Sequence, residues 1–162
     1  MIDELRQRFL EIAPDADFVS LRFQEERGES IGVRMGVLQP VSTAVDGGVM
    51  ITVTDQGGLG YAATSDLSPS GLAEAARRAH RWAQRTAGAS VTDFSKLSHA
   101  ESSGTFETPV SKPWESLGLG EKVDLLKSQC EQLKTDDRIV DWWAALSRIQ
   151  AETLYLDTTG SD

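Results

Sequence analysis

The stretch that decides the fold is residues 49–63, VMITVTDQGGLGYAA. In its first half, Val49, Ile51 and Val53 alternate with Met50, Thr52 and Thr54, which is the period of a half-buried strand. Residues 55–58, DQGG, supply turn residues, and residues 59–63 follow as a return strand. The sequence therefore predicts a β-hairpin over 49–63.

A helix is predicted directly after this hairpin. Ser68 is a good N-cap and Pro69 suits the first helical position, while Gly88 is a plausible stop. The apolar stripe consists of Leu72, Ala75, Ala76, Ala79, Trp82 and Ala83. Because this stripe is rich in alanine, we expect the helix to pack closely on a sheet. Helical spacing predicts two more helices, over 2–12 and 119–133.

Alternation predicts further strands on both sides of this core. An early hairpin is expected from 18–24 and 31–37, with its turn at the charged residues 25–29 and Gly28 free to take a positive φ. A short strand is expected over 41–45, ending at 46–48, DGG. A last hairpin is expected from 139–146 and 153–156. Residues 89–117 lack a sustained period and read as a long connection, with a short strand near 105–110.

Runs of strands set apart from helices indicate an α+β fold, an antiparallel sheet of hairpins with about three helices packed on one face. The adjacent Trp142 and Trp143 point to opposite faces of a strand, so one belongs to the core and the other needs a cover. The last hairpin ends at residues 157–162, DTTGSD, as if more chain should follow. We therefore expect residues 1–162 to be one N-terminal domain of a longer protein.

Composition narrows the function classes. The chain of 162 residues carries 16 basic and 25 acidic side chains, a formal net charge of -9, which disfavours nucleic acid and anionic membrane as partners. A single cysteine excludes an intramolecular disulfide and a cysteine-rich zinc module. The apolar stretches fall far short of a membrane span of ~20 residues, and the N-terminus lacks a signal peptide, so a cytoplasmic location is expected.

The reactive residue types do not form a catalytic or metal-binding pattern. His80 has no carboxylate or histidine three or four residues away and reads as a surface or boundary histidine, and His99 reads as a solvated loop residue. Cys130 falls on an apolar helical stripe and reads as a small buried side chain. Residues 57–60, GGLG, lack the Lys-Ser/Thr of a phosphate loop, and 157–160, DTTG, read as turn residues. No catalytic, cofactor-binding or metal-binding residue is assigned.

Three stretches together resemble the N-terminal domain of the TldD/PmbA family of zinc-dependent peptidases, whose members are also described as modulators of DNA gyrase. They are residues 16–23, ADFVSLRF, with the Glu-rich turn after them, residues 57–68, GGLGYAATSDLS, and the closing pattern of helix, Ala145-Leu146-Ser147 strand and Tyr-containing strand end. The resemblance covers essentially the whole chain.

The resemblance implies a role beside a catalytic domain. In the family the zinc site lies in a C-terminal domain, on a helix with a His-Glu-x-x-x-His motif, so no catalytic residue is carried over to this chain. The implied role is to cover that domain, shape access for an unfolded peptide and help form a homo- or heterodimer with a family member, some members having lost the metal motif. A peptide could add as a strand to a sheet edge.

One alternative class is a stand-alone, non-enzymatic interaction module that binds through the strand of Trp142 and Trp143. The inactive partner subunit of a family pair is another. A small enzyme complete in 162 residues would need a reactive constellation that these residues do not display. The peptide substrate, the retention of zinc in the parent protein and the role of residues 89–117 are left open by the sequence.

Overall fold

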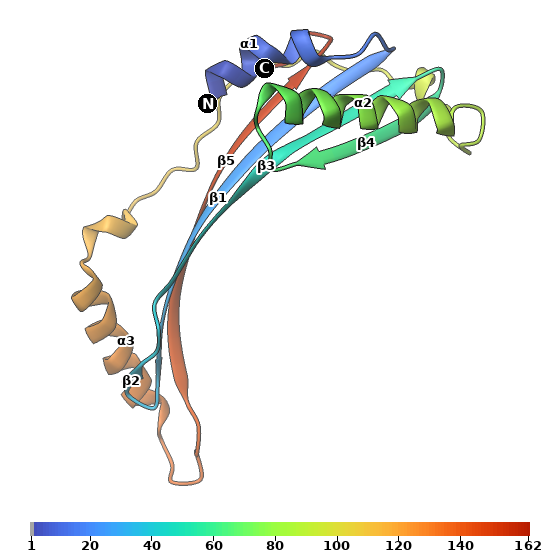
Figure 1. Cartoon of the computed structure of the whole chain (residues 1–162). Helices are drawn as coiled ribbons and strands as arrows, with labels where there is room; N and C mark the ends of the chain where they lie inside the picture. Colours follow the sequence, from blue (N-terminus) through green and yellow to red (C-terminus); the bar gives the residue numbers. More distant parts are fainter. Residues whose placement is uncertain (1) are drawn as a thin grey trace. The chain divides into compact units, whose positions relative to one another are not determined.

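The computed structural model describes residues 2–162 and has an α+β fold, as predicted (Figure 1). Its sheet has the strand order β2-β1-β3-β4, and β5 also pairs with β1. The main elements are α1 (Ile2–Ile12), β1 (Phe18–Arg34), β2 (Val37–Leu38), β3 (Ser42–Asp55), β4 (Gly58–Thr64), α2 (Pro69–Thr86), α3 (Leu119–Leu133) and β5 (Trp143–Asp157).

The contacts divide the chain into two compact units. Unit 1 comprises residues 1–25, 47–106 and 152–162, and unit 2 comprises residues 26–46 and 107–151. The long strands β1, β3 and β5 contribute residues to both units. Each unit has a hydrophobic cluster of its own.

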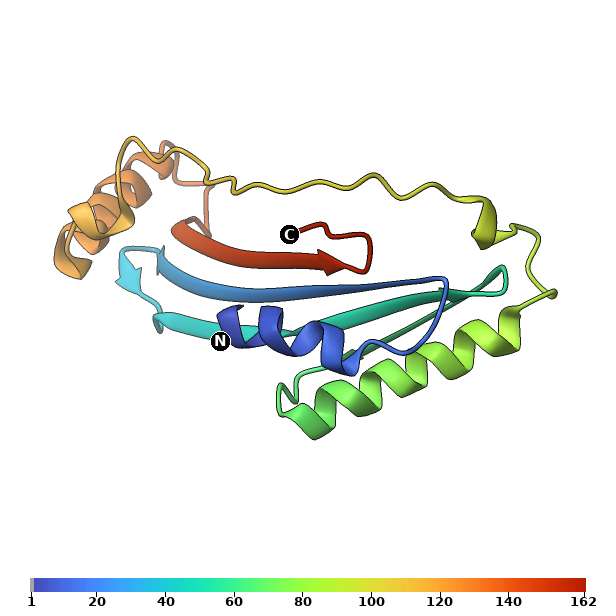
Figure 2. The ribbon, with the colours of Figure 1, turned by 90° about the horizontal axis from the view of Figure 1, so that it is seen from above.

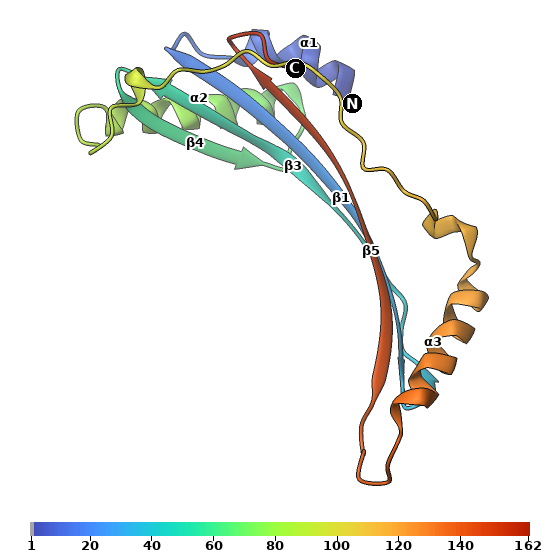
Figure 3. The ribbon, with the colours of Figure 1, turned by 180° about the vertical axis from the view of Figure 1, so that it is seen from behind.

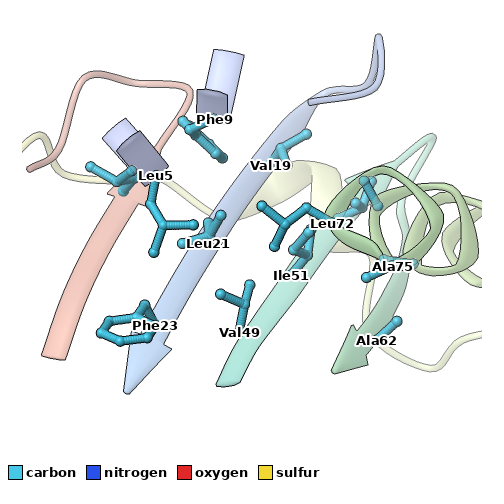
Figure 4. Packing of buried hydrophobic residues seen from close by; sticks show 14 of the residues in the cluster. Leu5, Phe9, Val19, Leu21, Phe23, Val49, Ile51, Ala62, Leu72 and Ala75 are labelled. Atoms are coloured by element: carbon cyan, nitrogen blue, oxygen red, sulfur yellow. The ribbon is translucent and has the colours of Figure 1, made fainter. Parts of the chain in front are cut away.

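In unit 1, helices α1 and α2 cover strands of the sheet (Figures 2 and 4). Alternate residues of the strands point toward the helices, because side chains on a strand change face at every residue. The helices contribute Leu5 and Phe9 from α1, and Leu72, Ala75, Ala76, Ala79 and Ala83 from α2. The strands contribute Val19, Leu21, Phe23, Val49, Ile51, Val53, Ala62, Leu154 and Leu156.

In unit 2, α3 packs against its own strand residues. Leu126 and Cys130 of the helix form a buried cluster with Ile31 and Val33 of β1. Lys122 is buried on the same helix, with its ammonium 3.9 Å from the centroid of the Trp114 ring. A cation over an aromatic face is attracted by the ring quadrupole, so the Trp114 ring stabilises the buried ammonium group.

The predicted helices and the central hairpin are confirmed. Residues 49–55 pair antiparallel with 58–64, and the two-residue turn has positive φ at Gln56 and Gly57 (51° and 77°). This geometry matches the right-handed twist of the flanking strands. Helix α2 begins as expected, with the Ser68 hydroxyl accepting a hydrogen bond from the Gly71 N–H at 3.1 Å.

The predicted turn at residues 25–29 is wrong, because β1 is one strand from Phe18 to Arg34. Gly28 is not among the glycines with positive φ, and the turn lies at Met35 and Gly36, with φ of 50° and 78°. Charged residues are tolerated at exposed and half-buried positions of a strand, and residues 25–29 are half-buried or exposed, so the run of glutamates does not mark a change of direction.

Two further predicted strand ends are also wrong. Strand β3 continues through Gly47 and Gly48, and β5 is a single strand over the segment that was expected to form the last hairpin. A Cβ at Gly48 would lie 2.7 Å from the Thr64 carbonyl oxygen, so glycine is present there because another backbone passes close by. Residues 149–153 of β5 are exposed on both faces. Their sequence therefore lacks apolar alternation, and this is why it indicates a turn.

Residues 89–117 are irregular, as predicted, with two short 3₁₀ helices at 94–96 and 114–116 and no strand near 105–110. Residues 102–104 run beside the last residues of the chain (Figure 2). The Asp162 N–H donates to the Ser102 carbonyl at 3.1 Å, and the Gly104 N–H donates to the Asp162 carbonyl at 3.1 Å. Backbone pairing therefore fixes this part of the long connection.

Candidate peptide-binding edge

Strand β4 forms an edge of the sheet in unit 1 (Figure 3). Its register pairs Leu59 with Thr54 and Tyr61 with Thr52. The backbone N–H and C=O of Leu59 bond to the Thr86 hydroxyl, at 2.9 and 2.8 Å, and therefore point away from β3. Backbone direction alternates along an antiparallel strand, so the N–H and C=O of Tyr61 and Ala63 point outward as well.

The open part of this edge is short. Thr86 occupies the outward groups at Leu59, and in the sheet formed by residues 2–162 no further strand pairs with β4 beyond it. Unpaired outward N–H and C=O groups are a template for a second extended chain. The edge can therefore accept an extended backbone at Tyr61 and Ala63.

Helix α2 lies directly against the inner face of β4 because two strand positions lack a side chain. A Cβ on Gly60 would collide with the Ala79 carbonyl oxygen and the Ala83 nitrogen, and one on Gly58 would collide with the Ala83 carbonyl oxygen. Glycine in a strand often marks such a close approach of another backbone. Gly58 contacts the end of α2, and Gly60 contacts the turn of the helix before it. These contacts show the direction in which α2 runs along β4.

The side of α2 next to this edge is aromatic and basic. Trp82 contacts the Gly60 position through its Cβ and is 52% exposed, and the Arg85 guanidinium carbon lies 5.3 Å from the Trp82 ring centroid. Arg78 is one turn before Trp82 and exposed, on the same side of the helix. Tyr61 is 66% exposed and points to the opposite face of the sheet from Gly60. Aromatic groups thus flank both faces of the edge.

The four arginines of α2 are not equivalent. Glu74 accepts hydrogen bonds from both Arg77 and Arg81, at 2.8 and 3.2 Å, and these bonds hold the pKa of the Glu74 carboxyl below its ordinary value. Within residues 2–162, Arg78 and Arg85 form no ion pair with a carboxylate. The two arginines nearest the open edge are therefore available to an acidic partner.

His80 lies on the other side of α2, at the boundary of the core as predicted. Its Nε2 is 2.8 Å from the Asp55 carboxylate oxygen, and the Gln84 amide nitrogen is 3.3 Å from the same Nε2. One ring nitrogen cannot donate to Asp55 and accept from Gln84 at once, so the shorter contact to the largely buried Asp55 sets the role of Nε2 as donor. The carboxylate comes from 25 residues earlier, which local spacing could not reveal.

The other singled-out residues have structural roles. His99 is exposed, as predicted, and also stacks on Phe18 at 3.5 Å between ring centroids. Cys130 is buried as predicted, with its thiol 3.5 Å from the Val33 carbonyl oxygen. Trp142 packs against the cluster of unit 2, whereas Trp143 is 65% exposed, which confirms the expectation of opposite faces.

Asp157 organises the turn that ends β5. Its Oδ1 accepts hydrogen bonds from the Thr159 N–H and hydroxyl and from the Ser161 N–H, at 2.9, 2.6 and 3.1 Å. Burial opposes ionisation, but these hydrogen bonds outweigh it and hold the pKa of the Asp157 carboxyl below its ordinary value. Gly160 has a φ of 105°, so residues 157–160 have the turn chemistry that was predicted.

Within residues 2–162, no group of three or more His, Cys, Asp and Glu side chains could hold a metal ion, so the donor set does not fit a zinc site. Over the same residues, none of the helices combines the length and the apolar character that crossing a membrane requires. Thr86, which limits the open edge of β4, has no signal in the sequence.

One family model and several solved structures are similar to this chain. The family model described as PmbA/TldA metallopeptidase domain 1 matches residues 19–83, which contain the β3–β4 hairpin and most of α2. No curated protein matches the chain. Three solved structures share its fold.

A proposed modulator of a DNA gyrase from Thermotoga maritima is 23% identical, with a TM-score of 0.72, over 99% of this chain and 36% of that one. TldE from Thermococcus kodakarensis is 18% identical, with a TM-score of 0.68, over 99% and 35%. A proposed modulator of DNA gyrase from Bacteroides thetaiotaomicron is 14% identical, with a TM-score of 0.66, over 98% and 36%. The chain thus spans about a third of the length of these proteins. The family model that matches the central hairpin and helix, together with the shared fold, supports the resemblance of this chain to the N-terminal domain of the TldD/PmbA family.

Proposed function

We propose that this chain is the non-catalytic domain of a TldD/PmbA-like metallopeptidase, and that it guides an unfolded peptide by adding it as a strand to β4. The observation that carries the proposal is the open backbone edge at Tyr61 and Ala63, within the segment matched by the metallopeptidase family model. Backbone pairing holds a chain without reading its sequence, which suits a peptidase that acts on unfolded segments.

The proposal assigns hydrolysis to another part of the parent protein. A zinc ion bound there would polarise the scissile carbonyl and activate a water. The residues of this chain would hold and orient the substrate backbone. The proposal retains a C-terminal domain of the same protein and a second family member as partners, and a cytoplasmic location.

Strand addition is tested by hydrogen exchange of the full 162-residue chain. We expect a ten-residue peptide of alternating Thr and Gln to slow exchange in the 49–63 hairpin. The matched variant is Ala63→Pro, which removes one outward N–H at the edge without touching the ladder to β3. Circular dichroism checks that this variant keeps its fold.

Loss of the protection in Ala63→Pro, with the fold intact, would support strand addition at β4. Unchanged exchange in the unmodified chain at saturating peptide would refute it. The alternative is an interaction module, and the observation that supports it is Trp143, which is 65% exposed on a strand. That module would give a different pattern of exchange. In that case a partner protein would protect residues 143–149 and leave 49–63 unchanged.

A further inference from the structure

The arginines of α2, the helix beside the edge of β4, differ in whether they pair with a carboxylate. We propose that the edge of β4 selects extended segments with carboxylate side chains on alternate residues. This inference rests on the proposed strand addition and names its substrate class. It is drawn from the observation that two arginines of α2 pair with a carboxylate and the other two do not.

A strand added to β4 would present its side chains alternately to the two faces of the sheet. Gly60 and Ala62 face α2, and Tyr61 faces the other way, so a neighbouring strand also alternates between these two sides. On the α2 side its residues would lie beside Arg78 and Trp82, because Gly60 contacts the helix at Ala79, Trp82 and Ala83. Residues two apart on the peptide are about 6.7 Å apart and share this side.

The arginines of α2 differ in whether a carboxylate already pairs with them. Arg77 and Arg81 share the Glu74 carboxylate, whereas Arg78 and Arg85 have no carboxylate partner in the described chain, residues 2–162. Arg85 lies over Trp82 and so extends the positive surface toward the end of the edge closed by Thr86. A carboxylate on the peptide would supply the missing partner, while an aliphatic stem could cover the Trp82 ring.

The positive charge of Arg78 and Arg85 is local, because the formal net charge of the whole chain is -9. The screening length is about 10 Å at 0.1 M salt, so distant carboxylates act weakly on a bound peptide while arginines in contact with it act fully. Exposed ion pairs are weak, so the preference should be modest. We expect about a threefold change in affinity for each arginine that contacts a carboxylate.

The experiment compares three ten-residue peptides that alternate Thr with Glu, Gln or Lys. Their binding to the 162-residue chain is measured at 0.1 M salt by fluorescence of a dye on the peptide, and hydrogen exchange of residues 49–63 confirms the location. We expect the Glu peptide to bind several-fold more tightly than the Gln peptide, and the Lys peptide most weakly. The difference between Glu and Gln should vanish at 1 M salt.

The matched variants are Arg78→Gln and Arg77→Gln. Both remove one exposed charge from the same helix, but only Arg78 lies beside the edge, and Arg77 is already paired with Glu74. Arg78→Gln should reduce the Glu preference about threefold, and Arg77→Gln should leave it unchanged. Equal effects of the two variants would overturn the proposal.

Two outcomes separate this inference from the function beneath it. Equal affinity of all three peptides at 0.1 M salt, with protection of 49–63 by each, would overturn the charge preference and leave strand addition standing. Absence of protection by any of them would refute strand addition itself. Protection that rises with protein concentration and without peptide would show a second copy at this edge, and would overturn the peptide as its occupant.

Discussion

The Thr86 hydroxyl accepts a hydrogen bond from the Leu59 N–H and donates one to the Leu59 carbonyl, at 2.9 and 2.8 Å. One side chain thus takes the place of a neighbouring strand at a single residue of β4. The same oxygen lies 3.1 Å from the Ala83 carbonyl oxygen, but its one hydrogen is best used on the shorter contact to Leu59. This pair of bonds joins the end of α2 to the sheet edge.

Replacing Thr86 by Val should destabilise the chain, because it keeps the shape of the side chain and leaves the Leu59 backbone groups without their partner. We expect a loss of about 1–2 kcal/mol in the free energy of unfolding, measured by urea denaturation. Thr86→Ser, which retains the hydroxyl, should lose less than half of this. Equal losses in both variants would contradict a role for the hydroxyl.

Gly60→Ala should be among the most damaging single changes in unit 1. Its Cβ would collide with backbone atoms of Ala79 and Ala83, which are held in a helix and cannot move aside. We expect a loss of at least about 3 kcal/mol, measured by thermal or urea unfolding. The control is Gly120→Ala in α3, where a Cβ meets nothing within 4 Å.

Gly120→Ala should be neutral or stabilise the chain by up to about 1 kcal/mol, since alanine is a better helix former than glycine. A Gly60→Ala variant with wild-type stability would show that α2 does not press against β4 as closely as described.

Asp157 should make the stability of the chain depend on pH in the acidic range. Its pKa is lowered in the folded state by hydrogen bonds from Thr159 and Ser161 that outweigh burial, so its contribution is complete above the unfolded pKa of about 4. That contribution is lost as pH falls through the lower folded pKa. Asp157→Asn should cost about 1 kcal/mol at pH 7, and the difference from the unmodified chain should shrink as pH decreases.

The control for this measurement is Asp124→Asn on the exposed side of α3. Urea unfolding at several pH values between 2 and 7 compares the three proteins. A difference between Asp157→Asn and the unmodified chain that grows toward low pH would contradict the assignment.

Cys130 should be unreactive toward a thiol reagent in the native protein. Its side chain is fully buried against β1, so modification requires α3 to separate from β1. We expect slow labelling with a rate that rises with urea, followed by mass spectrometry. The control is Ser128→Cys, on the same helix and exposed, which should react at once.

The sequence was most informative where local chemistry and packing agree. The hairpin at Asp55 and Gly58 was predictable because a two-residue turn demands positive φ, and α2 because Ser68 and the alanine stripe mark its start and its buried face. Strand ends were not predictable in β1 and β5. Alternation reports which side chains are buried. The half-buried or exposed segment 25–29 and the exposed segment 149–153 remain strand although no side chain in them is fully buried.

The candidate site was predictable only in outline. A sheet edge near residues 49–63 followed from the hairpin, but the partition of the four arginines did not. Arg77, Arg78, Arg81 and Arg85 are indistinguishable by composition, and only the positions of Glu74 and the β4 edge separate them. Likewise Asp55 and His80 are brought together by the return of the chain, and no spacing rule along the sequence anticipates this.

The glycines at positions 58 and 60 have a mechanical consequence. With no side chains between them, the backbones of β4 and α2 have no soft layer that could absorb a small displacement of either element. A displacement of the strand edge would pass directly to the helix. The strand and the helix should therefore move together and unfold in one cooperative step. Amide protons of residues 59–63 and 75–83 should therefore exchange with a common opening free energy.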